Sequence, residues 1–181
     1  GSSGALVAAL YHRYAKRGKS SSRSSISKAD IPQVKSDLAV LEAWFHGTSS
    51  GIDPLICYMQ HPLLSKKDQT IHPIDIPRYN LTSNDAIFLI NSGKAIKTAP
   101  LVDQFMKDCE NPTFKDSILN EYIPLNNSCI RSLIDADIEK FTHDVHALSE
   151  FQLNYFTNMI PLSLHKEWKA GLSSGKFTLK L

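Results

Sequence analysis

The 181-residue sequence predicts an α+β protein, in which helices and short strands occupy different stretches of the chain. Apolar residues recur at helical spacing before residue 46 and again after residue 98. Between these stretches, short apolar runs lie next to proline, asparagine and aspartate, which is typical of strands.

Two helices are expected in the first part of the chain. Residues 5–17 form an Ala- and Leu-rich segment with no polar lead-in. The second helix ends at Gly47 and carries apolar residues at helical spacing, at Ile31, Val34, Leu38, Leu41 and Phe45.

Three strands are expected after these helices. Residues 54–60, PLICYMQ, and residues 85–91, DAIFLIN, are short apolar runs, and the second is the clearest candidate for a buried strand. Residues 71–77, IHPIDIP, are predicted to form an edge strand, because their two prolines cannot donate to a central sheet ladder.

The remainder of the chain is predicted to be mainly helical. The expected helices are residues 99–109, about 113–123 with a continuation near 127–133, 135 or 137 to about 159, and 161 to about 173. Residues 176–181, KFTLKL, alternate like a strand that has no partner after it. This ending predicts that the sequence is part of a longer protein.

Composition excludes several classes of function. A net charge of +2 with no polybasic block argues against a nucleic-acid-binding protein. The longest apolar runs are far shorter than the ~20 residues that a membrane-spanning helix needs. Three widely spaced cysteines are typical of reduced thiols, so a cytoplasmic location is expected.

The N-terminal stretch Gly1-Ser2-Ser3-Gly4 has two interpretations. Short Gly/Ser runs at an N-terminus are often remnants of an expression tag. A Gly/Ser turn that leads into a helix is also how a phosphate loop is built, because backbone N–H groups and the helix dipole favour an anion there. The four residues alone leave both interpretations open.

The stretch EAWFHGTSSGID, from Glu42 to Asp53, carries the chemistry. Its hydroxyls and backbone N–H groups suit phosphate or hydroxyl oxygens. A carboxylate at Asp53 can accept a proton from an alcohol, and one at Glu42 can bind a hard cation such as Mg²⁺. Each residue alone also has a structural interpretation: Asp53 as a turn residue, Glu42 as a solvated charge and His46 as a hydrogen-bonding group.

Together these motifs resemble the GHMP superfamily of small-molecule kinases. HGTSSGID at residues 46–53 is similar to the corresponding stretch of mevalonate kinases, and GSSGA at residues 1–5 resembles the second half of the superfamily's GLGSSxA ATP loop. The two matches occur in the family's order, which favours the phosphate loop over the tag remnant.

The resemblance implies roles for individual residues. Asp53 matches the catalytic aspartate, and Glu42, eleven residues earlier, matches the Mg²⁺-binding glutamate, with Ser3 as a second Mg²⁺ contact. The ATP phosphates would lie over Gly1, Ser2, Ser3 and Gly4. The substrate side would include His46, Gly47, Thr48, Ser50 and Thr98.

The sequence also departs from the family pattern. Ser49 stands where the family often has proline, and Gly4 where alanine is common. The family's N-terminal strands, with a lysine beside the catalytic aspartate, and its C-terminal glycine-rich loop are both absent. The resemblance therefore implies the central part of a longer kinase.

The resemblance further implies an α+β fold with the two-lobed architecture of GHMP kinases. Residues 1–82 would be part of the N-terminal ATP-binding lobe, and residues 83–181 a ferredoxin-like C-terminal lobe. The expected reaction is the ATP- and Mg²⁺-dependent phosphorylation of a small alcohol, mevalonate to 5-phosphomevalonate in isoprenoid biosynthesis, without nucleic-acid or membrane partners. Three alternatives remain open. The substrate could be phosphomevalonate, a sugar or homoserine; the chain could be a non-catalytic fragment or interaction domain; and it could form a homodimer.

Overall fold

The computed structural model describes residues 2–15, 26–77, 86–93 and 98–181. The chain divides into two compact units, Gly1–Ile76 and Pro77–Leu181, called here the N-terminal and C-terminal units. The lobe boundary predicted at residues 82 and 83 lies in a segment outside the described residues. Helices dominate, and a small sheet makes the protein mixed α and β, as the sequence predicts.

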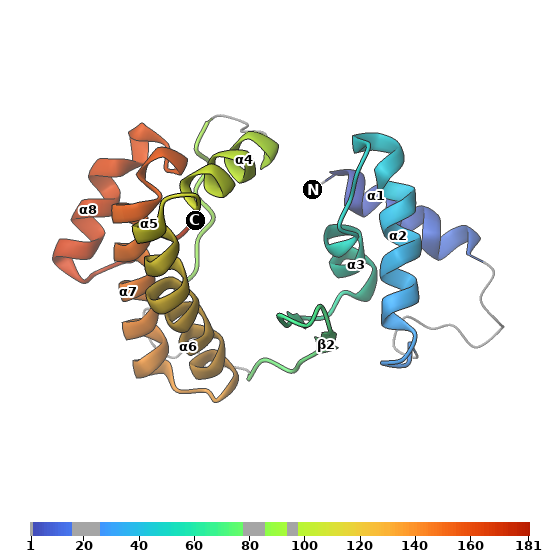
Figure 1. Cartoon of the computed structure of the whole chain (residues 1–181). Helices are drawn as coiled ribbons and strands as arrows, with labels where there is room; N and C mark the ends of the chain where they lie inside the picture. The colour runs from blue at the N-terminus through green and yellow to red at the C-terminus, as the bar shows by residue number, and fades with distance from the viewer. Residues whose placement is uncertain (1, 16–25, 78–85, 94–97) are drawn as a thin grey trace. The chain divides into compact units, whose positions relative to one another are not determined.

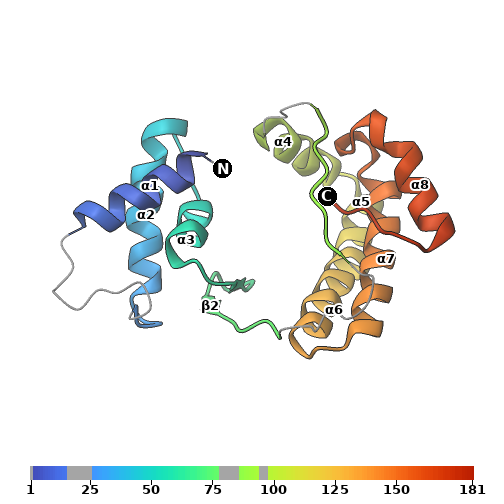
Figure 2. The same cartoon turned by 180° about the vertical axis from the view of Figure 1, so that it is seen from behind.

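The N-terminal unit consists of three helices and a hairpin. These elements are α1 (Ser2–Tyr14), α2 (Ile31–His46), α3 (Ile52–Met59), β1 (Leu63–Ser65) and β2 (Ile71–Pro73). Figures 1 and 2 show α1 lying across α2, with α3 beside both. The two strands are antiparallel, with Leu64 opposite His72. The predicted edge strand at 71–77 is therefore confirmed only over its first three residues.

Helix α3 corrects the prediction of a strand at residues 54–60. Leu55 and Tyr58 are buried while Ile56 is exposed, which is the spacing of a helix face. The core that they join is formed by Val7, Ala8, Tyr11, Ile31, Val34, Leu38, Leu55 and Tyr58. A short continuous apolar run has no period of its own, so packing against α1 and α2 decides its conformation.

The C-terminal unit is helical over most of its described length. Its elements are α4 (Thr98–Asp108), α5 (Pro112–Ser117), η2 (Ile118–Tyr122), α6 (Ile123–Ile134), α7 (Ile138–Tyr155), η3 (Thr157–Met159), η4 (Leu162–Leu164) and α8 (His165–Ser174). Asn111 caps α5, Asp137 caps α7, and Gly175 ends α8 in a left-handed conformation. The helices predicted in this region are confirmed, except that the long one ends at Tyr155 instead of about 159 and the last one begins at His165 instead of 161.

A single π-helical turn joins α5 to α6. Pro124 has no N–H to donate to the carbonyl of Asn120, four residues earlier, so a regular α-helix would lose a hydrogen bond there. The π-helical segment η2 ends just before the proline and keeps the run from Pro112 to Ile134 continuous.

Two segments that the sequence assigned to strands are neither helix nor strand. Residues 85–91 were predicted to form a buried strand. Asp85 lies outside the described residues, and Ile87 and Leu89 are 97% and 102% exposed. Residues 176–181 fold back onto α7 and α8 instead: Leu179 is buried with Ile160 and Trp168, and the Leu181 N–H donates to Gln152. In both cases the sequence pattern is that of a strand, but no strand of the described chain pairs with it.

A buried carboxylate ties α6 to α7. Asp144 accepts hydrogen bonds from Ser128 (2.7 Å) and from Lys140 Nζ (2.9 Å), and its side chain is almost inaccessible. Burial on its own would raise the pKa of Asp144. The hydrogen bonds from Ser128 and Lys140, with the charge of Lys140, outweigh burial and hold this pKa below its ordinary value.

This arrangement predicts acid-sensitive stability of the C-terminal unit. A carboxylate with a lowered pKa in the folded state stabilises the fold above its unfolded-state pKa, and the contribution is lost as the pH falls through the folded-state pKa. We expect Asp144→Asn to reduce the free energy of unfolding by about 2 kcal/mol at pH 7, and by much less at pH 3.

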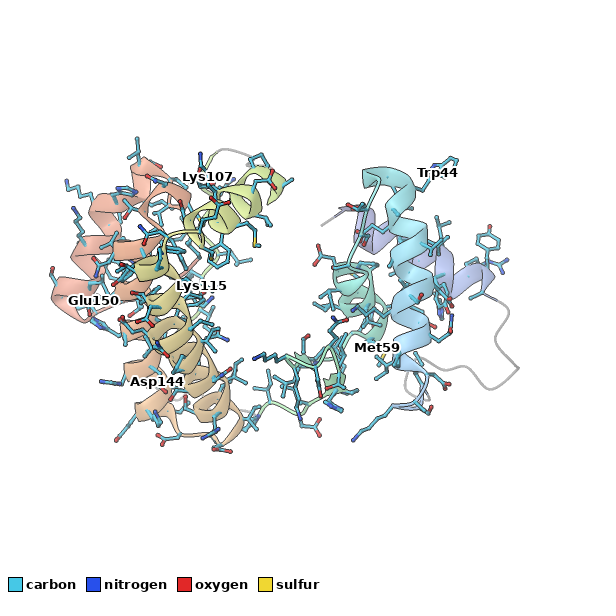
Figure 3. All side chains as sticks on the ribbon, viewed as in Figure 1. Trp44, Met59, Lys107, Lys115, Asp144 and Glu150 are labelled. Carbon is cyan, nitrogen blue, oxygen red and sulfur yellow. The ribbon has the colours of Figure 1, made fainter. Side chains whose placement is uncertain are left out.

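Urea unfolding measures this effect. Unfolding exposes the buried Trp168, so its fluorescence reports the transition, whereas Trp44 is already exposed and its fluorescence changes little. Glu150→Gln, an exposed carboxylate on the same helix, is the matched control (Figure 3). An Asp144→Asn effect that is equal at both pH values would contradict the prediction.

Two further expectations concern cysteines and membranes. Cys57, Cys109 and Cys129 are all free thiols, as their spacing predicts. Within the described ranges, no helix combines the length and apolar character needed to cross a membrane.

Candidate functional site

The candidate site lies where the first turn of α1, the last turns of α2 and the start of α3 meet. At Gly4 the backbone of α1 comes close to the start of α3: a Cβ on Gly4 would lie 3.2 Å from Pro54 N and 3.4 Å from Asp53 Cβ. The sequence predicted a Gly/Ser turn before the helix, but Ser2–Gly4 already form the first turn of α1. Ser3 and Gly4 are therefore brought directly against the start of α3.

Glu42 is the central residue of this meeting point. It is only 7% exposed, although a glutamate on a surface helix is usually solvated. Ser3 Oγ donates to Glu42 Oε1 at 3.2 Å, and Ser49 Oγ donates to Glu42 Oε2 at 2.5 Å. Each carboxylate oxygen thus has one hydroxyl partner. Ser3 lies 39 residues before Glu42 in the sequence, and Ser49 lies seven residues after it.

No cation of the described chain pairs with the Glu42 carboxylate. A buried charge is normally compensated by an ion pair, by a metal ion or by several hydrogen bonds. Two neutral hydroxyls compensate Glu42 only in part. Its oxygen-rich surroundings are the kind of donor set that Mg²⁺ prefers, so these residues fit the cation that the sequence implies.

A metal ion at Glu42 would have few protein ligands. Among the residues that the structure describes, no group of three His, Cys, Asp or Glu side chains is placed to bind a metal. Mg²⁺ typically binds one or two carboxylates and takes its other ligands from water and substrate phosphates. The single carboxylate of Glu42 is compatible with that mode and not with a site made of protein ligands alone.

The turn from Ser49 to Gly51 holds the start of α3. The Gly51 N–H donates to Ser49 Oγ at 2.9 Å, and the Ile52 N–H donates to Ser50 Oγ at 3.3 Å. Gly51 has φ +72°, and a Cβ there would lie 2.4 Å from the Lys35 carbonyl oxygen. Only glycine fits this position, so the turn is tied closely to α2.

Asp53 occupies the first turn of α3 and is exposed. Its carboxylate forms no hydrogen bond or ion pair with other described residues, which leaves it available to a solute. Its Cβ faces the Gly4 backbone, so a molecule that contacts Asp53 also lies next to the N-terminal turn of α1. An acidic side chain at a helix start is also stabilised by the helix dipole.

The structure brings together only some of the residues predicted for the site. Ser3, Gly4, Glu42 and Asp53 converge, and Ser50 lies in the adjoining turn. Gly47 ends α2 with φ +79°, and Thr48 is exposed. Gly1 and the side chains of Ser2, His46 and Thr98 lie outside the described part of the structure.

Two residues near the site are absent from the predicted set. Ser49 belongs to the hydroxyl-rich turn and stands where the family often has proline, but no role at Glu42 was assigned to it; it donates the shorter hydrogen bond to Glu42. A proline there could not make this contact. Lys35, two helical turns before Glu42 on the same side of α2, carries no motif that could have marked it.

Comparison with known proteins identifies no relative of this chain. No protein-family model matches the sequence, and no curated protein or solved structure matches it either.

Proposed function

We propose that this chain carries the ATP- and Mg²⁺-binding region of a small-molecule kinase of the GHMP type, with mevalonate as its first candidate substrate. The convergence of Ser3, Glu42 and Asp53 carries the proposal. Two motifs that lie far apart in the sequence imply roles in phosphoryl transfer for these residues. Their proximity in the folded N-terminal unit supports those roles.

The phosphates of ATP would bind at the first turn of α1. A helix N-terminus suits an anion, because backbone N–H groups there point outward along the axis and the helix dipole favours negative charge. Glu42 and Ser3 would hold Mg²⁺, and Ser49 would keep the Glu42 carboxylate oriented. The cation, when bound, neutralises charge on the phosphate oxygens.

Asp53 would act on the alcohol. Its exposed carboxylate would accept a hydrogen bond from the substrate hydroxyl and take its proton as the oxygen attacks the γ-phosphorus and ADP leaves. For mevalonate the reacting group is its primary hydroxyl. Most of the rate enhancement would come from positioning and electrostatics, as in phosphoryl transfer generally.

The role of Glu42 is tested by ATP binding at a series of Mg²⁺ concentrations, measured by isothermal titration calorimetry. We expect Glu42→Gln to raise the Mg²⁺ concentration for half-maximal ATP binding about tenfold, because one charge-assisted interaction is lost. Glu139→Gln, an exposed glutamate in the C-terminal unit, is the control with the same change. An unchanged Mg²⁺ titration in Glu42→Gln would contradict this role.

Turnover with a panel of alcohols tests the substrate. Mevalonate, phosphomevalonate, galactose and homoserine are offered with Mg²⁺ and ATP, and ADP release is measured. Preference for another member of the panel would reassign the substrate within the kinase class. ATP binding without turnover of any alcohol would favour the non-catalytic alternative, and the absence of ATP binding would reject the proposal as a whole.

A further inference from the structure

A second concave site lies next to the Ser49–Gly51 turn, and Glu42 is not part of its lining. It is a pocket of about 350 Å³ between the first half of α2, this turn and the β1–β2 hairpin. That volume is within the usual range for small-molecule sites. Neither the resemblance nor the proposed kinase chemistry assigns any role to it.

Lys35 is the charged residue of this pocket. It is half-buried, and no acidic side chain lines the pocket. Lys35 also forms no ion pair with any residue that the structure describes. The nearest carboxylates along α2 are engaged elsewhere: Asp37 accepts from Tyr11, and Glu42 accepts from two serines. An anionic ligand would therefore compensate the Lys35 charge.

The remaining polar groups of the pocket are suited to the same ligand. Ser36, Ser50 and Gln69 line it together with Lys35. The Ser50 hydroxyl accepts from the Ile52 N–H, which leaves its own proton to donate. Neither the Ser36 nor the Gln69 side chain hydrogen-bonds within the described structure. Several donors around one cation are typical of carboxylate and phosphate recognition.

Part of the pocket lining is apolar. Ile31 is almost fully buried in the core of the N-terminal unit, and Ile71 of β2 packs against that core. A bound molecule would therefore meet aliphatic side chains as well as polar groups. This combination favours a small amphiphilic anion over a free inorganic ion.

We propose that this pocket binds a small molecule with a carboxylate or phosphate head, bound by Lys35 and its neighbouring donors, and a short aliphatic body over Ile31 and Ile71. Adjacent serines of one turn serve the two sites, since Ser49 contacts Glu42 and Ser50 lines the pocket. The proposal does not depend on kinase activity.

Three probes with one aliphatic body test the proposal: butyl phosphate, butyrate and butan-1-ol. Each is titrated into the ¹⁵N-labelled full chain without ATP or Mg²⁺, and amide shifts are followed by NMR. We expect an anionic probe to shift the amides of Ser36, Ala39 and Ser50 with saturation, and the alcohol to leave them unchanged. Whichever of phosphate and carboxylate binds more tightly identifies the head group.

Charge variants complete the test. Lys35→Gln should weaken binding of the anionic probe about tenfold, whereas Lys35→Arg should retain most of it. Lys115→Gln, an exposed lysine on α5, removes the same charge from the C-terminal unit and should have no effect (Figure 3). The proposal would be overturned if Lys35→Gln and Lys115→Gln lost affinity for the anionic probe equally, or if butan-1-ol bound as tightly as the anions. Amide shifts confined to residues outside the pocket would also overturn it. Because no nucleotide is present, these outcomes are independent of those for Glu42.

Discussion

Replacing Asp53 with asparagine is expected to reduce phosphoryl transfer about 10²- to 10⁴-fold while leaving Mg²⁺-dependent ATP binding unchanged. Asparagine has the shape of aspartate but cannot accept the hydroxyl proton. The fold should tolerate the change, because Asp53 is exposed and its carboxylate has no described partner. The loss should therefore appear in kcat rather than in the affinity for ATP.

ADP release with a saturating alcohol measures this effect, and calorimetry with Mg²⁺ and ATP gives the binding control. Asp75→Asn removes an exposed carboxylate from the same unit, outside the candidate site, and should retain full activity. An unchanged melting temperature in both variants excludes unfolding as the cause. Near-normal turnover in Asp53→Asn would reject Asp53 as the general base.

Replacing Gly51 with alanine is expected to destabilise the N-terminal unit by about 3 kcal/mol, the largest single effect on its stability predicted here. A Cβ at this position is disfavoured by φ +72°, and it would also lie 2.4 Å from the Lys35 carbonyl oxygen and 2.9 Å from Ala39 Cβ. Both neighbours belong to α2, so the turn would have to move away from that helix. Ser49 would then withdraw from Glu42.

Gly47→Ala is the matched control for this variant. Gly47 has a similar positive φ, +79°, but no atom lies within 4 Å of its Cβ position. It should add backbone strain alone, roughly 1–2 kcal/mol for φ +79° with ψ −39°, and therefore less than Gly51→Ala. Hydrogen exchange of the buried Val34 and Leu38 amides reports the opening of this unit. Equal costs in the two variants would show that the turn does not depend on close contact with α2.

The sequence and the structure contribute different parts of the candidate site. Glu42 and Asp53 are recognisable because carboxylates flank a turn rich in glycine and hydroxyls, a local pattern that can be read along the chain. The contact between Ser3 and Glu42 joins residues 39 positions apart, so it depends on how α1 packs against α2. Ser49 lies in that turn, but the pattern does not indicate that its hydroxyl contacts Glu42. Lys35 has no local signal, because its pocket forms only when α2 packs beside the turn and the hairpin.

What the sequence by itself determined is the set of helices whose ends carry strong local signals. Asn111 before Pro112, Asp137 before α7 and Gly175 after α8 act through their own backbone and nearby N–H groups, so no distant contact is needed. The conformation of the short apolar runs was decided by tertiary structure alone. Residues 54–59 are helical because α1 and α2 cover one face of them, whereas residues 86–91 are exposed and pair with no strand of the described chain. Apolar character alone does not specify conformation; the surface available for burial does.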